Sequence, residues 1–429
     1  MEKFFDLFYQ CSGVSIDTRT VKKGELFIAL KGDNFNGNEY ASKALAAGAK
    51  FAVVDEKEYE VDGKVFWVED ALVFLQKLAN FHRHKMETPI LAITGSNGKT
   101  TTKEILNKVL SKKYNTLATK GNLNNHIGVP LTLLSLSESH TFAIVEMGAN
   151  KPGDIDELCR IAEPNFGIIS NIGKAHLEGF GSLEGVVKTK TELYRYISDF
   201  PTSGSTIFYD IANEYLKENL PENINKVSYN GGDVNGELLG MNPFVELKYQ
   251  YQNTWSRALE TKIIGEYNYL NLLCAACVGE YFKVEKKDIY EALENYSPNN
   301  NRSQLKETDR DNVLILDAYN ANPSSVNSAL MSFAKMETKQ RNKKIILGDM
   351  LELGDESVLE HEKVINKTKE LNLEGIFVGP IYHSILGGQN SFNNKEESVK
   401  SLLSESWSSC QILLKGSRGI GLESLEEIL

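Results

Sequence analysis

Short apolar runs alternate along the chain with stretches in which apolar residues recur every three or four positions. The short runs are typical of buried strands, and the recurring spacing is typical of helices. This alternation favours parallel sheets covered by helices, so we expect an α/β fold. The predicted strands are residues 25–30, 51–54, 89–93, 141–146, 166–170, 313–317, 344–347, 375–378 and 411–414, and the predicted helices include residues 40–49 and 103–110.

Two polar stretches interrupt this alternation and divide the chain. Residues 82–88 are interpreted as a linker, and residues 297–301 form a second polar boundary. A length of 429 residues also favours about three domains. We expect a small α/β domain, a central domain with a parallel sheet and a doubly wound C-terminal domain. Their predicted bounds are residues 1–86, 87–300 and 301–429.

Residues 226–265 depart from the pattern, because Gly-rich turns separate short segments of alternating apolar and polar residues. Such alternation is typical of half-buried antiparallel strands. We therefore expect a small antiparallel insertion in the central domain.

Composition and charge limit the class of protein. Hydrophobic residues make up 41% and charged residues 24% of the chain, as in ordinary globular proteins. No run approaches the roughly 18 apolar residues of a membrane span, and the N-terminus lacks the features of a signal peptide. We expect a cytoplasmic protein without membrane insertion. The net charge of −11 argues against bulk nucleic-acid binding.

The five cysteines, an odd number, fit a reducing compartment. Cys274 and Cys277 have redox-like spacing but lie in a helical run of small apolar residues. This context favours buried structural thiols. The remaining cysteines are too scattered to predict a metal site.

The segment 93–102, Ile-Thr-Gly-Ser-Asn-Gly-Lys-Thr-Thr-Thr, lies between a predicted strand and a predicted helix. This layout is typical of a phosphate-binding loop, in which backbone N–H groups and a helix N-terminus face phosphate oxygens. Lys99 is expected to reach the terminal phosphates, and the Thr100 hydroxyl is expected to ligate Mg²⁺. A plain Gly-containing turn is the alternative. The predicted ATP-binding residues of the loop are Gly95, Ser96, Asn97, Gly98, Lys99, Thr100 and Thr101.

The loop has the short form Gly-x-x-Gly-Lys-Thr, because Ile93 stands where the usual first glycine would be. In this form it resembles the ATP loop of the Mur ligases and their folylpolyglutamate synthetase relatives, which are ATP-dependent amide-forming enzymes. Further motifs resemble those of one Mur ligase, in the same order along the chain. They are residues 14–19, 30–38, 122–132, 146–155, 170–182, 317–323, 347–354 and 415–419.

The resemblance implies an N-terminal domain that holds a UDP-sugar peptide, a central ATP-binding domain and a Rossmann-like C-terminal domain that closes over ATP and the amine substrate. It also implies the reaction. ATP phosphorylates the terminal carboxylate of UDP-N-acetylmuramoyl-tripeptide, and the amine of D-alanyl-D-alanine attacks the acyl phosphate. The expected partners are these small molecules, with no nucleic acid, and the expected state is a monomer.

The resemblance also assigns catalytic and metal-binding residues. Glu146 ends a predicted buried strand, where open α/β sheets bind ligands, and its carboxylate suits Mg²⁺. With Lys99 as a further catalytic residue, two Mg²⁺ ions are expected at Thr100, Glu146, His176 and Lys190, the last as a CO₂-derived carbamate. From the residues alone, Glu146 could cap a loop, His176 would be structural and Lys190 would be a solvated helix charge.

Other residues are assigned to substrates by the same resemblance. ATP contacts are implied for Asn268, Arg302 and Asp317, although Asn268 could instead be a helix N-cap and Tyr267 replaces the family's usual His. The family's Asp-Gly-His is Asn36-Gly37-Asn38 here, and loop capping is the alternative for Asn124 and Asn125. The implied UDP-substrate residues are Thr18, Arg19, Lys31, Asn124 and Asn125, and the implied D-alanyl-D-alanine residues are Asn320, Asp349, Lys415, Ser417 and Arg418.

Three other kinds of protein are alternatives to the Mur ligase that these motifs resemble. A sibling Mur ligase that adds the third amino acid carries an Asp-Asn-Pro-Arg signature, which this sequence lacks, and commonly Asp-Tyr-Ala-His where this chain has residues 317–320. A folylpolyglutamate synthetase lacks the N-terminal UDP domain. A P-loop switch that hydrolyses ATP slowly, without ligation, belongs to a different class. No motif encodes lysine or diaminopimelate as the third peptide residue.

Overall fold

The computed structural model describes residues 2–32, 34–337 and 341–429. Backbone contacts divide the chain into two compact units, and each contains strands and helices, which confirms the α/β class. The first unit comprises Met1–Ile93, Tyr114–Ala149 and Gly153–Phe166, and the second comprises Thr94–Lys113, Asn150–Pro152 and Gly167–Leu429. The three domain bounds read from the sequence stay predictions.

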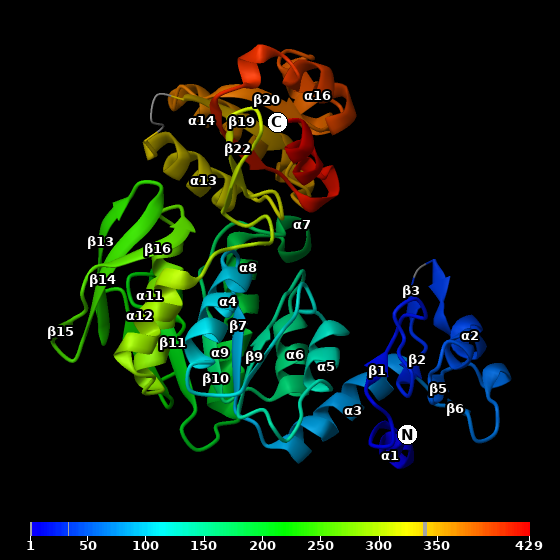
Figure 1. Ribbon diagram of the computed structural model, residues 1–429. Coiled ribbons are helices and arrows are strands. Elements are labelled where there is room, and N and C mark those ends of the chain that lie inside the picture. The colour runs from blue at the N-terminus through cyan, green and yellow to red at the C-terminus, as the bar shows by residue number, and fades with distance from the viewer. Residues whose placement is uncertain (1, 33, 338–340) are drawn as a thin grey trace. The chain divides into compact units, whose positions relative to one another are not determined.

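The N-terminal part of the first unit folds into a small parallel sheet. Its elements are η1 (Glu2–Phe4), α1 (Phe5–Phe8), β1 (Val14–Ser15), β2 (Leu26–Ile28), β3 (Lys31–Gly32), β4 (Phe35–Asn36), η2 (Gly37–Tyr40), α2 (Ala41–Ala46), β5 (Phe51–Val54), η3 (Lys57–Tyr59) and β6 (Val65–Trp67). The strand order is β1-β2-β5-β6 (Figure 1). Side chains such as Phe27 and Ala52 pack with α2 in an apolar core. The strands and the helix predicted before residue 60 are confirmed.

A second set of parallel strands in the first unit includes the strand that leads to the glycine loop. β8 (Thr116–Ala118), β9 (Phe142–Glu146) and β7 (Ile90–Thr94) are adjacent in that order. Every residue of β7 and β9 is buried, as expected for continuous apolar runs in a parallel sheet. Helix α3 (Ala71–Met86) packs against α5 (Gly128–Leu133) and α6 (Asp154–Ala162).

Helix α3 corrects the interpretation of residues 82–86, which form its last turns and not a linker. Two of these polar residues are buried because backbone carbonyls bind them. His82 Nε2 lies 3.0 Å from the Leu136 carbonyl oxygen, and Arg83 Nε–H donates to the Ala162 carbonyl at 3.0 Å. Carbonyls that are left without partners at a helix end accept such donors, so a polar stretch can remain helical.

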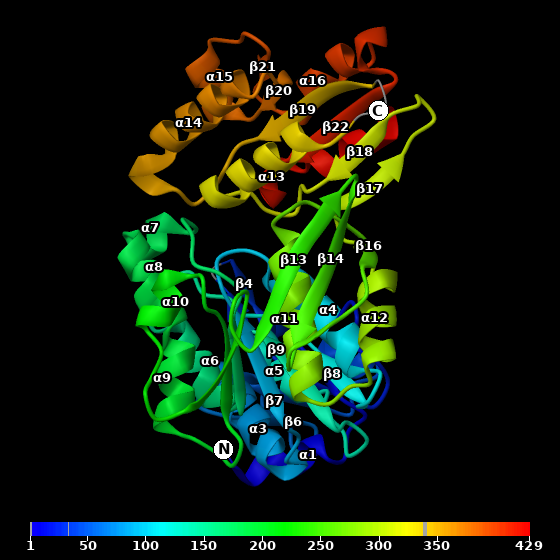
Figure 2. The same ribbon diagram turned by 90° about the vertical axis from the view of Figure 1, so that its left-hand side faces the viewer.

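The central part of the second unit combines a mixed sheet with helices. Its elements are α4 (Lys99–Leu110), β10 (Phe166–Ile169), α7 (Leu177–Phe180), α8 (Leu183–Lys190), α9 (Glu192–Asp199), β11 (Thr206–Asp210), α10 (Glu214–Glu218), β12 (Asn225–Tyr229), β13 (Val234–Met241), β14 (Phe244–Tyr251), β15 (Thr254–Trp255), β16 (Leu259–Ile264), α11 (Asn268–Tyr281) and α12 (Lys286–Asn295). The strand order is β10-β11-β12-β13-β14-β15. β13 and β14 run side by side in Figure 2. β14 pairs antiparallel with β13, β15 and β16, which confirms the predicted insertion.

Cys274 and Cys277 lie on α11 and are buried free thiols, as predicted. Burial raises the pKa of Cys274 to about 12. The thiolate is the reactive form of cysteine, so burial of both thiols favours a structural role.

The C-terminal part of the second unit is doubly wound. Its elements are β17 (Gln304–Glu307), β18 (Val313–Leu316), α13 (Pro323–Lys335), β19 (Asn342–Gly348), η4 (Gly354–Glu356), α14 (Ser357–Glu370), β20 (Glu374–Val378), α15 (Pro380–Leu386), β21 (Ser391–Phe392), α16 (Lys395–Leu402), η5 (Glu405–Trp407), β22 (Cys410–Lys415), η6 (Arg418–Ile420) and η7 (Leu422–Ile428). The order is β17-β18-β22-β19-β20-β21, and all pairs are parallel except β17–β18. One apolar cluster joins the sheet to α13 and α14, and another joins it to α16 and η7.

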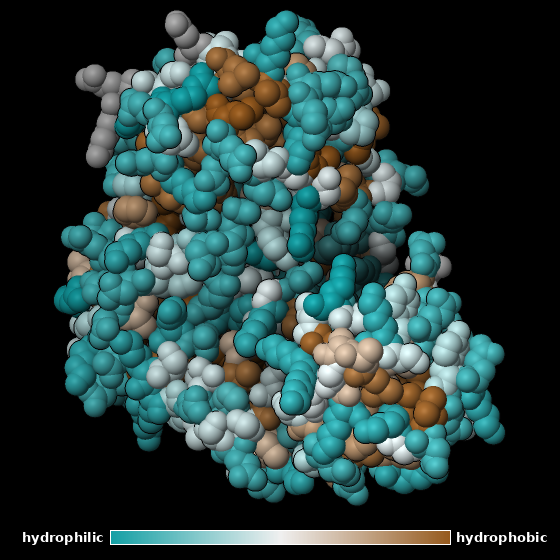
Figure 3. All heavy atoms as spheres, turned by 45° about the vertical axis from the view of Figure 1, so that its right-hand side comes forward, coloured by the Kyte–Doolittle hydropathy of each residue, from teal (hydrophilic) through white to brown (hydrophobic). Residues whose placement is uncertain are grey.

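Hydrophilic side chains cover most of the face drawn in Figure 3, and apolar side chains gather there in small groups. Such groups are normal, because apolar atoms contribute more than half of the accessible surface of a folded protein. Within the described parts of the chain, no helix is both long and apolar enough to cross a membrane.

We expect Arg83→Ala to destabilise the first unit. The Arg83 guanidinium donates to the carbonyls of Ala162 (3.0 Å) and Glu163 (3.2 Å) at the end of α6, so its removal leaves acceptors unsatisfied. The expected loss is about 2 kcal/mol of unfolding free energy, measured by urea denaturation. Arg19→Ala is the control, because that guanidinium is exposed and pairs with Asp17 on the same loop. Equal losses in both variants would contradict this role of Arg83.

Candidate active site

The glycine loop joins β7 to α4, and Lys99 folds back onto it. The Lys99 ammonium donates to the carbonyls of Gly95 (2.7 Å) and Ser96 (3.3 Å). Gly98 is the N-cap of α4 with φ 77, and Lys99, Thr100 and Thr101 follow in the first turn. A helix N-terminus favours anions, because its N–H groups and the helix dipole point outward. The structure thus gathers the loop residues predicted for ATP into the form of a phosphate-binding loop.

A second segment, which follows β10, fixes the loop. The Ser96 N–H donates to the Asn171 carbonyl at 3.0 Å, and the Asn97 N–H donates to Asn171 Oδ1 at 2.9 Å. Ser96 Oγ also donates to the Gly173 carbonyl (2.9 Å) and accepts the Gly173 N–H (3.0 Å). The loop is therefore held in place by the protein itself. Asn171 was not singled out from the sequence, although it lies in one of the recognised motifs.

Two positions of the loop must be glycine, because other segments of the protein approach them closely. Gly95 has φ 140, and a Cβ there would lie 2.1 Å from Ser170 Oγ. A Cβ on Gly98 would lie 2.8 Å from Asn271 Oδ1. Any side chain at either position would push the loop away from its supports and would also strain the backbone.

Glu146 lies in the first unit at the end of β9 and is 1% exposed. Asn124 Nδ2–H donates to Glu146 Oε1 at 2.8 Å, and the Glu146 N–H donates to Thr119 Oγ1 at 3.0 Å. Asn124 therefore orients the carboxylate at the strand end. Asn125 Oδ1 accepts the N–H groups of Ile127 (3.2 Å) and Gly128 (2.9 Å) in the turn that leads into α5. These bonds fit the capping alternative, and the predicted substrate contact of Asn125 stays a prediction.

His176 lies between β10 and α7. Its Nδ1 contacts a carboxylate oxygen of Glu352, and its ring meets Phe180 edge-on, with 6.3 Å between ring centroids. The contact with the imidazole lowers the pKa of Glu352. A carboxylate on one ring nitrogen is the usual way in which a metal-binding imidazole is oriented. Glu352 was not predicted, although it lies within a recognised motif.

Lys190 ends α8 and is 1% exposed. Its ammonium lies 5.2 Å from the centroid of the Phe180 ring. A solvated helix charge, the interpretation from the residues alone, is therefore wrong for Lys190, whereas the nearby Lys188 is exposed. Burial of an ammonium is costly, and Lys190 shares such burial with Lys103 and Lys415 among the described lysines.

Asn268 is the first residue of α11 and not its N-cap, which is Tyr267. Asn268 Nδ2 donates to the Ile264 carbonyl (2.7 Å) and to Ser303 Oγ (3.1 Å). Its Oδ1 accepts from Asn271 Nδ2 at 2.8 Å. The whole amide thus has partners within the protein, and its adenine contact stays a prediction. The Tyr267 hydroxyl bonds to Ser303 Oγ at 2.8 Å, and burial raises the pKa of Tyr267.

Two arginines flank Tyr319. The guanidinium carbon lies 3.7 Å from the ring centroid for Arg302 and 5.5 Å for Arg418, and both geometries permit cation–π attraction. Arg302 Nε has no hydrogen-bond partner among the described residues. Lys415, which is close to Arg418 in the sequence, is buried and pairs with Asp317 Oδ2 at 2.7 Å. Residues predicted for the nucleotide thus lie beside residues predicted for the dipeptide.

Asp349 and Ser417 are buried and bind backbone groups. The Asp349 carboxylate accepts the N–H groups of Ile381 (2.9 Å) and Tyr382 (3.0 Å) at the start of α15. Ser417 Oγ accepts the Leu351 N–H at 2.9 Å. A contact of Asp349 or Ser417 with the dipeptide would therefore have to compete with these bonds. Asn320, which is also predicted for the dipeptide, is exposed.

In the N-terminal part, Thr18 is half-buried and Arg19 is exposed. Arg19 Nη2 lies 2.6 Å from Asp17 Oδ2, and the hydrogen bonds from Arg19 lower the pKa of Asp17 to about 2. The guanidinium is therefore held on its own loop.

Lys31 lies between two carboxylates, with its ammonium 2.9 Å from Asp55 Oδ1 and 3.0 Å from Glu56 Oε1. Asn38 is fully buried, and its Nδ2 donates to Asp55 Oδ1 at 2.7 Å. Asn38 stands where the family's Asp-Gly-His has its histidine. Its amide therefore orients Asp55, one of the two carboxylates that pair with Lys31.

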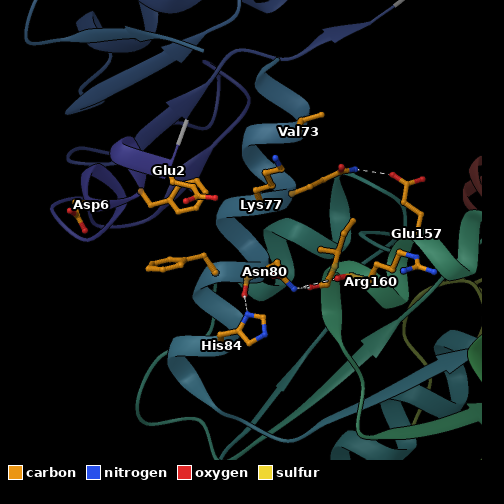
Figure 4. Close-up of a pocket in the computed structure, with 12 residues that line it drawn as sticks. Glu2, Asp6, Val73, Lys77, Asn80, His84, Glu157 and Arg160 are labelled. Carbon is orange, nitrogen blue, oxygen red and sulfur yellow. Dashed lines mark hydrogen bonds between the residues drawn. The ribbon is translucent and has the colours of Figure 1, made fainter. Parts of the chain in front are cut away.

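An open pocket of about 720 Å³ lies in the first unit among η1, α1, α3 and α6 (Figure 4). Lys77, Asn80 and His84 line it from α3, and Glu157 and Arg160 line it from α6. None of the residues that the sequence predicted for substrates or metal is among its lining residues.

Comparison with protein-family models decides between the alternatives for the family. Three descriptions match in order: Mur ligase family, catalytic domain (residues 10–83), Mur ligase middle domain (93–279) and Mur ligase, glutamate ligase domain (301–416). A UDP-N-acetylmuramoyl-tripeptide–D-alanyl-D-alanine ligase of Bacillus subtilis (strain 168) is 32% identical over 425 residues, which are 96% of this chain and 92% of that protein. The chain belongs to the Mur ligase family.

Solved structures of Mur ligases resemble this chain over nearly its whole length. MurF from Acinetobacter baumannii matches with a TM-score of 0.85 and 30% identity over 96% of this chain and 92% of that one. MurF ligase from Thermotoga maritima, in complex with ADP, matches with a TM-score of 0.85 and 25% identity over 99% and 97%. This Mur ligase is thus similar to both in all three of its matched regions.

We expect Gly95→Ala to weaken the binding of ADP by about tenfold or more, because the new Cβ would collide with Ser170 and strain the backbone. Isothermal titration calorimetry measures this affinity. Gly240→Ala is the control, since the nearest atom to its Cβ would be 3.5 Å away, an ordinary contact. ADP affinity that stays at the wild-type value in Gly95→Ala would show that the close approach at Gly95 does not shape a nucleotide site.

Proposed function

We propose that this chain joins D-alanyl-D-alanine to UDP-N-acetylmuramoyl-tripeptide at the expense of ATP, in peptidoglycan precursor synthesis. The products are UDP-N-acetylmuramoyl-pentapeptide, ADP and phosphate. The observation that carries the proposal is the similarity along 96% of the chain to a ligase of that name. We further infer a monomer in the cytoplasm, a compartment that suits the five free thiols.

The reaction has two chemical steps. A carboxylate oxygen of the tripeptide attacks the γ-phosphorus of ATP, and ADP leaves. The amine of D-alanyl-D-alanine then attacks the carbonyl carbon of the acyl phosphate and loses a proton, and the tetrahedral intermediate expels phosphate. Both steps bring anions together, so positioning and charge neutralisation supply most of the catalysis.

The glycine loop suits the first step. Its N–H groups and the start of α4 attract phosphate, and Asn171 fixes the loop in advance, so little reorganisation is needed. The Lys99 ammonium bonds to loop carbonyls at 2.7 and 3.3 Å and can exchange these bonds for phosphate oxygens. Arg302 would add a planar donor fork from the C-terminal part.

The residues present fit Mg²⁺. Among the described residues there is no group of three or more His, Cys, Asp or Glu that could hold a metal ion. Mg²⁺ commonly takes only one or two protein carboxylates and keeps waters and substrate phosphates as its other ligands, so a sparse set suits it. Thr100 and Glu146 would supply oxygen ligands, and His176 would add its imidazole. When bound, Mg²⁺ would neutralise phosphate charge.

Lys190 would serve as a carbamate. Its amine is buried at the end of α8, beside the Phe180 ring. The neutral amine is the form that adds CO₂, and the resulting carbamate carries oxygens that suit a hard cation. As the resemblance implies, Lys190 would then be one of the residues that hold the two expected Mg²⁺ ions, with Glu146 and His176.

The decisive experiment measures phosphate release with Mg²⁺-ATP, UDP-N-acetylmuramoyl-tripeptide and D-alanyl-D-alanine, and omits each in turn. We expect release only with all three, and a product with the mass of the UDP-pentapeptide. Tripeptides with lysine and with diaminopimelate are compared, because no motif distinguishes them. Release with a single amino acid and a shorter acceptor would instead indicate the sibling ligase, and substantial release with ATP alone would indicate a switch.

We expect Lys190→Ala to lower kcat by about 10- to 100-fold, as the loss of a metal-supporting group usually does. Lys188→Ala is a matched control on the same helix, since that side chain is exposed. Intact-mass measurement of protein kept in bicarbonate without acid should show one added CO₂ in wild type and none in Lys190→Ala. Wild type without the added mass, or full activity of Lys190→Ala, would contradict the carbamate.

A further inference from the structure

Lys174 makes two ion pairs that the proposed chemistry does not use. It lies in the segment after β10, close to His176. Its ammonium is 2.9 Å from Glu360 Oε1 and 3.2 Å from Glu356 Oε2. Glu356 ends η4 and Glu360 lies in the first turn of α14, so both belong to the C-terminal part. The Glu360 side chain is 5% exposed and that of Lys174 is 38% exposed, so the closer pair is partly shielded from solvent.

Further contacts join the same two segments. The Lys174 N–H donates to Ser324 Oγ at 3.0 Å, at the start of α13. The Glu178 N–H donates to the Glu352 carbonyl at 3.4 Å, and the Glu352 carboxylate contacts His176. The segment that fixes the glycine loop is thus also the one that meets the C-terminal part.

The C-terminal side of this contact is strongly acidic. Residues 352–360 include Glu352, Asp355, Glu356 and Glu360. Carboxylates near the segment that carries His176 would repel ATP and the acyl phosphate unless a cation offsets them. Lys174 is placed to do this, because its ammonium contacts two of the four.

We propose that Lys174 is a positioning residue for the ligation. Its ion pairs hold the acidic turn 352–360 against the segment that carries Asn171 and His176, and they offset the negative charge of that turn. The C-terminal part, which is expected to bind D-alanyl-D-alanine, is thereby kept in register with the phosphate loop. This inference rests on the proposed function, since it concerns the same reaction.

The test uses the full chain with Lys174→Ala. We expect kcat/KM for D-alanyl-D-alanine to fall by about fivefold to twentyfold, a usual size for coupling between sites. The Kd for ADP should stay within about twofold, because the contacts of Asn171 to the loop remain. Lys174→Arg should retain most of the activity, since its guanidinium can bind both carboxylates. A fall in ADP affinity equal to the fall in kcat/KM would indicate general damage to the loop and would overturn the inference.

Lys363→Ala is the matched control. Lys363 contacts the same Glu360 oxygen at 2.8 Å, but both residues lie on α14, so this pair joins no separate segments. We expect Lys363→Ala to behave as wild type. In the Lys174→Ala background, Glu360→Gln should cause little further loss, because contacting residues are not additive. Equal losses from Lys174→Ala and Lys363→Ala would overturn the inference.

Hydrogen exchange provides a measurement that does not need ligase activity. Amides of residues 352–360 should exchange faster in Lys174→Ala than in wild type, and those of Lys363→Ala should not. Wild-type exchange in Lys174→Ala would overturn the inference even in an active ligase. Faster exchange in Lys174→Ala, with a wild type that does not ligate, would instead overturn the proposed function and leave the contact in place.

Discussion

The close approach of Gly95 to Ser170 is the constraint on which the candidate site depends. A Cβ on Gly95 would lie 2.1 Å from Ser170 Oγ, so the loop can lie against the segment after β10 only with a glycine. That approach brings Asn171 within reach of the next two loop N–H groups (3.0 and 2.9 Å). The same segment continues to Lys174 and His176, which contact the C-terminal part. A local steric requirement therefore orders groups that lie far apart in the sequence.

A second support reaches the loop helix through buried polar side chains. Thr102 Oγ1–H donates to Asn271 Oδ1 (3.0 Å), and Asn271 Nδ2–H donates to Asn268 Oδ1 (2.8 Å). Asn268 Nδ2–H then donates to Ser303 Oγ (3.1 Å), next to Arg302. A buried network whose members all have partners is rigid, because each broken bond would leave a costly unpaired group. This hydrogen-bond network connects the first turn of α4 to the start of the C-terminal part.

The sequence predicted the features that depend on neighbouring residues. Continuous apolar runs located β7 and β9, and the spacing of glycines, Lys99 and Thr100 located the loop, because loop geometry is set within a few residues. Burial of polar residues was not predicted, since it depends on partners distant in sequence. Arg83 appeared to belong to a linker until carbonyls of α6 were seen to bind it. The bonds from the N–H groups at the start of α15 to Asp349 could likewise not be predicted. The antiparallel edge strand β17 was missed for the same reason, because only its pairing with β18 defines it.

The charge distribution explains how so acidic a chain could handle anionic substrates. The net charge is −11, so the long-range field repels phosphate, and attraction must come from local donors. Three of the candidate cations already have oxygen partners: Lys31 has two carboxylates, Lys415 has Asp317, and Lys99 has two loop carbonyls. These partners keep the cations oriented, and an incoming anion must displace or share them. A multiply charged phosphate competes better than a singly charged ion, because the attraction grows with the product of the charges.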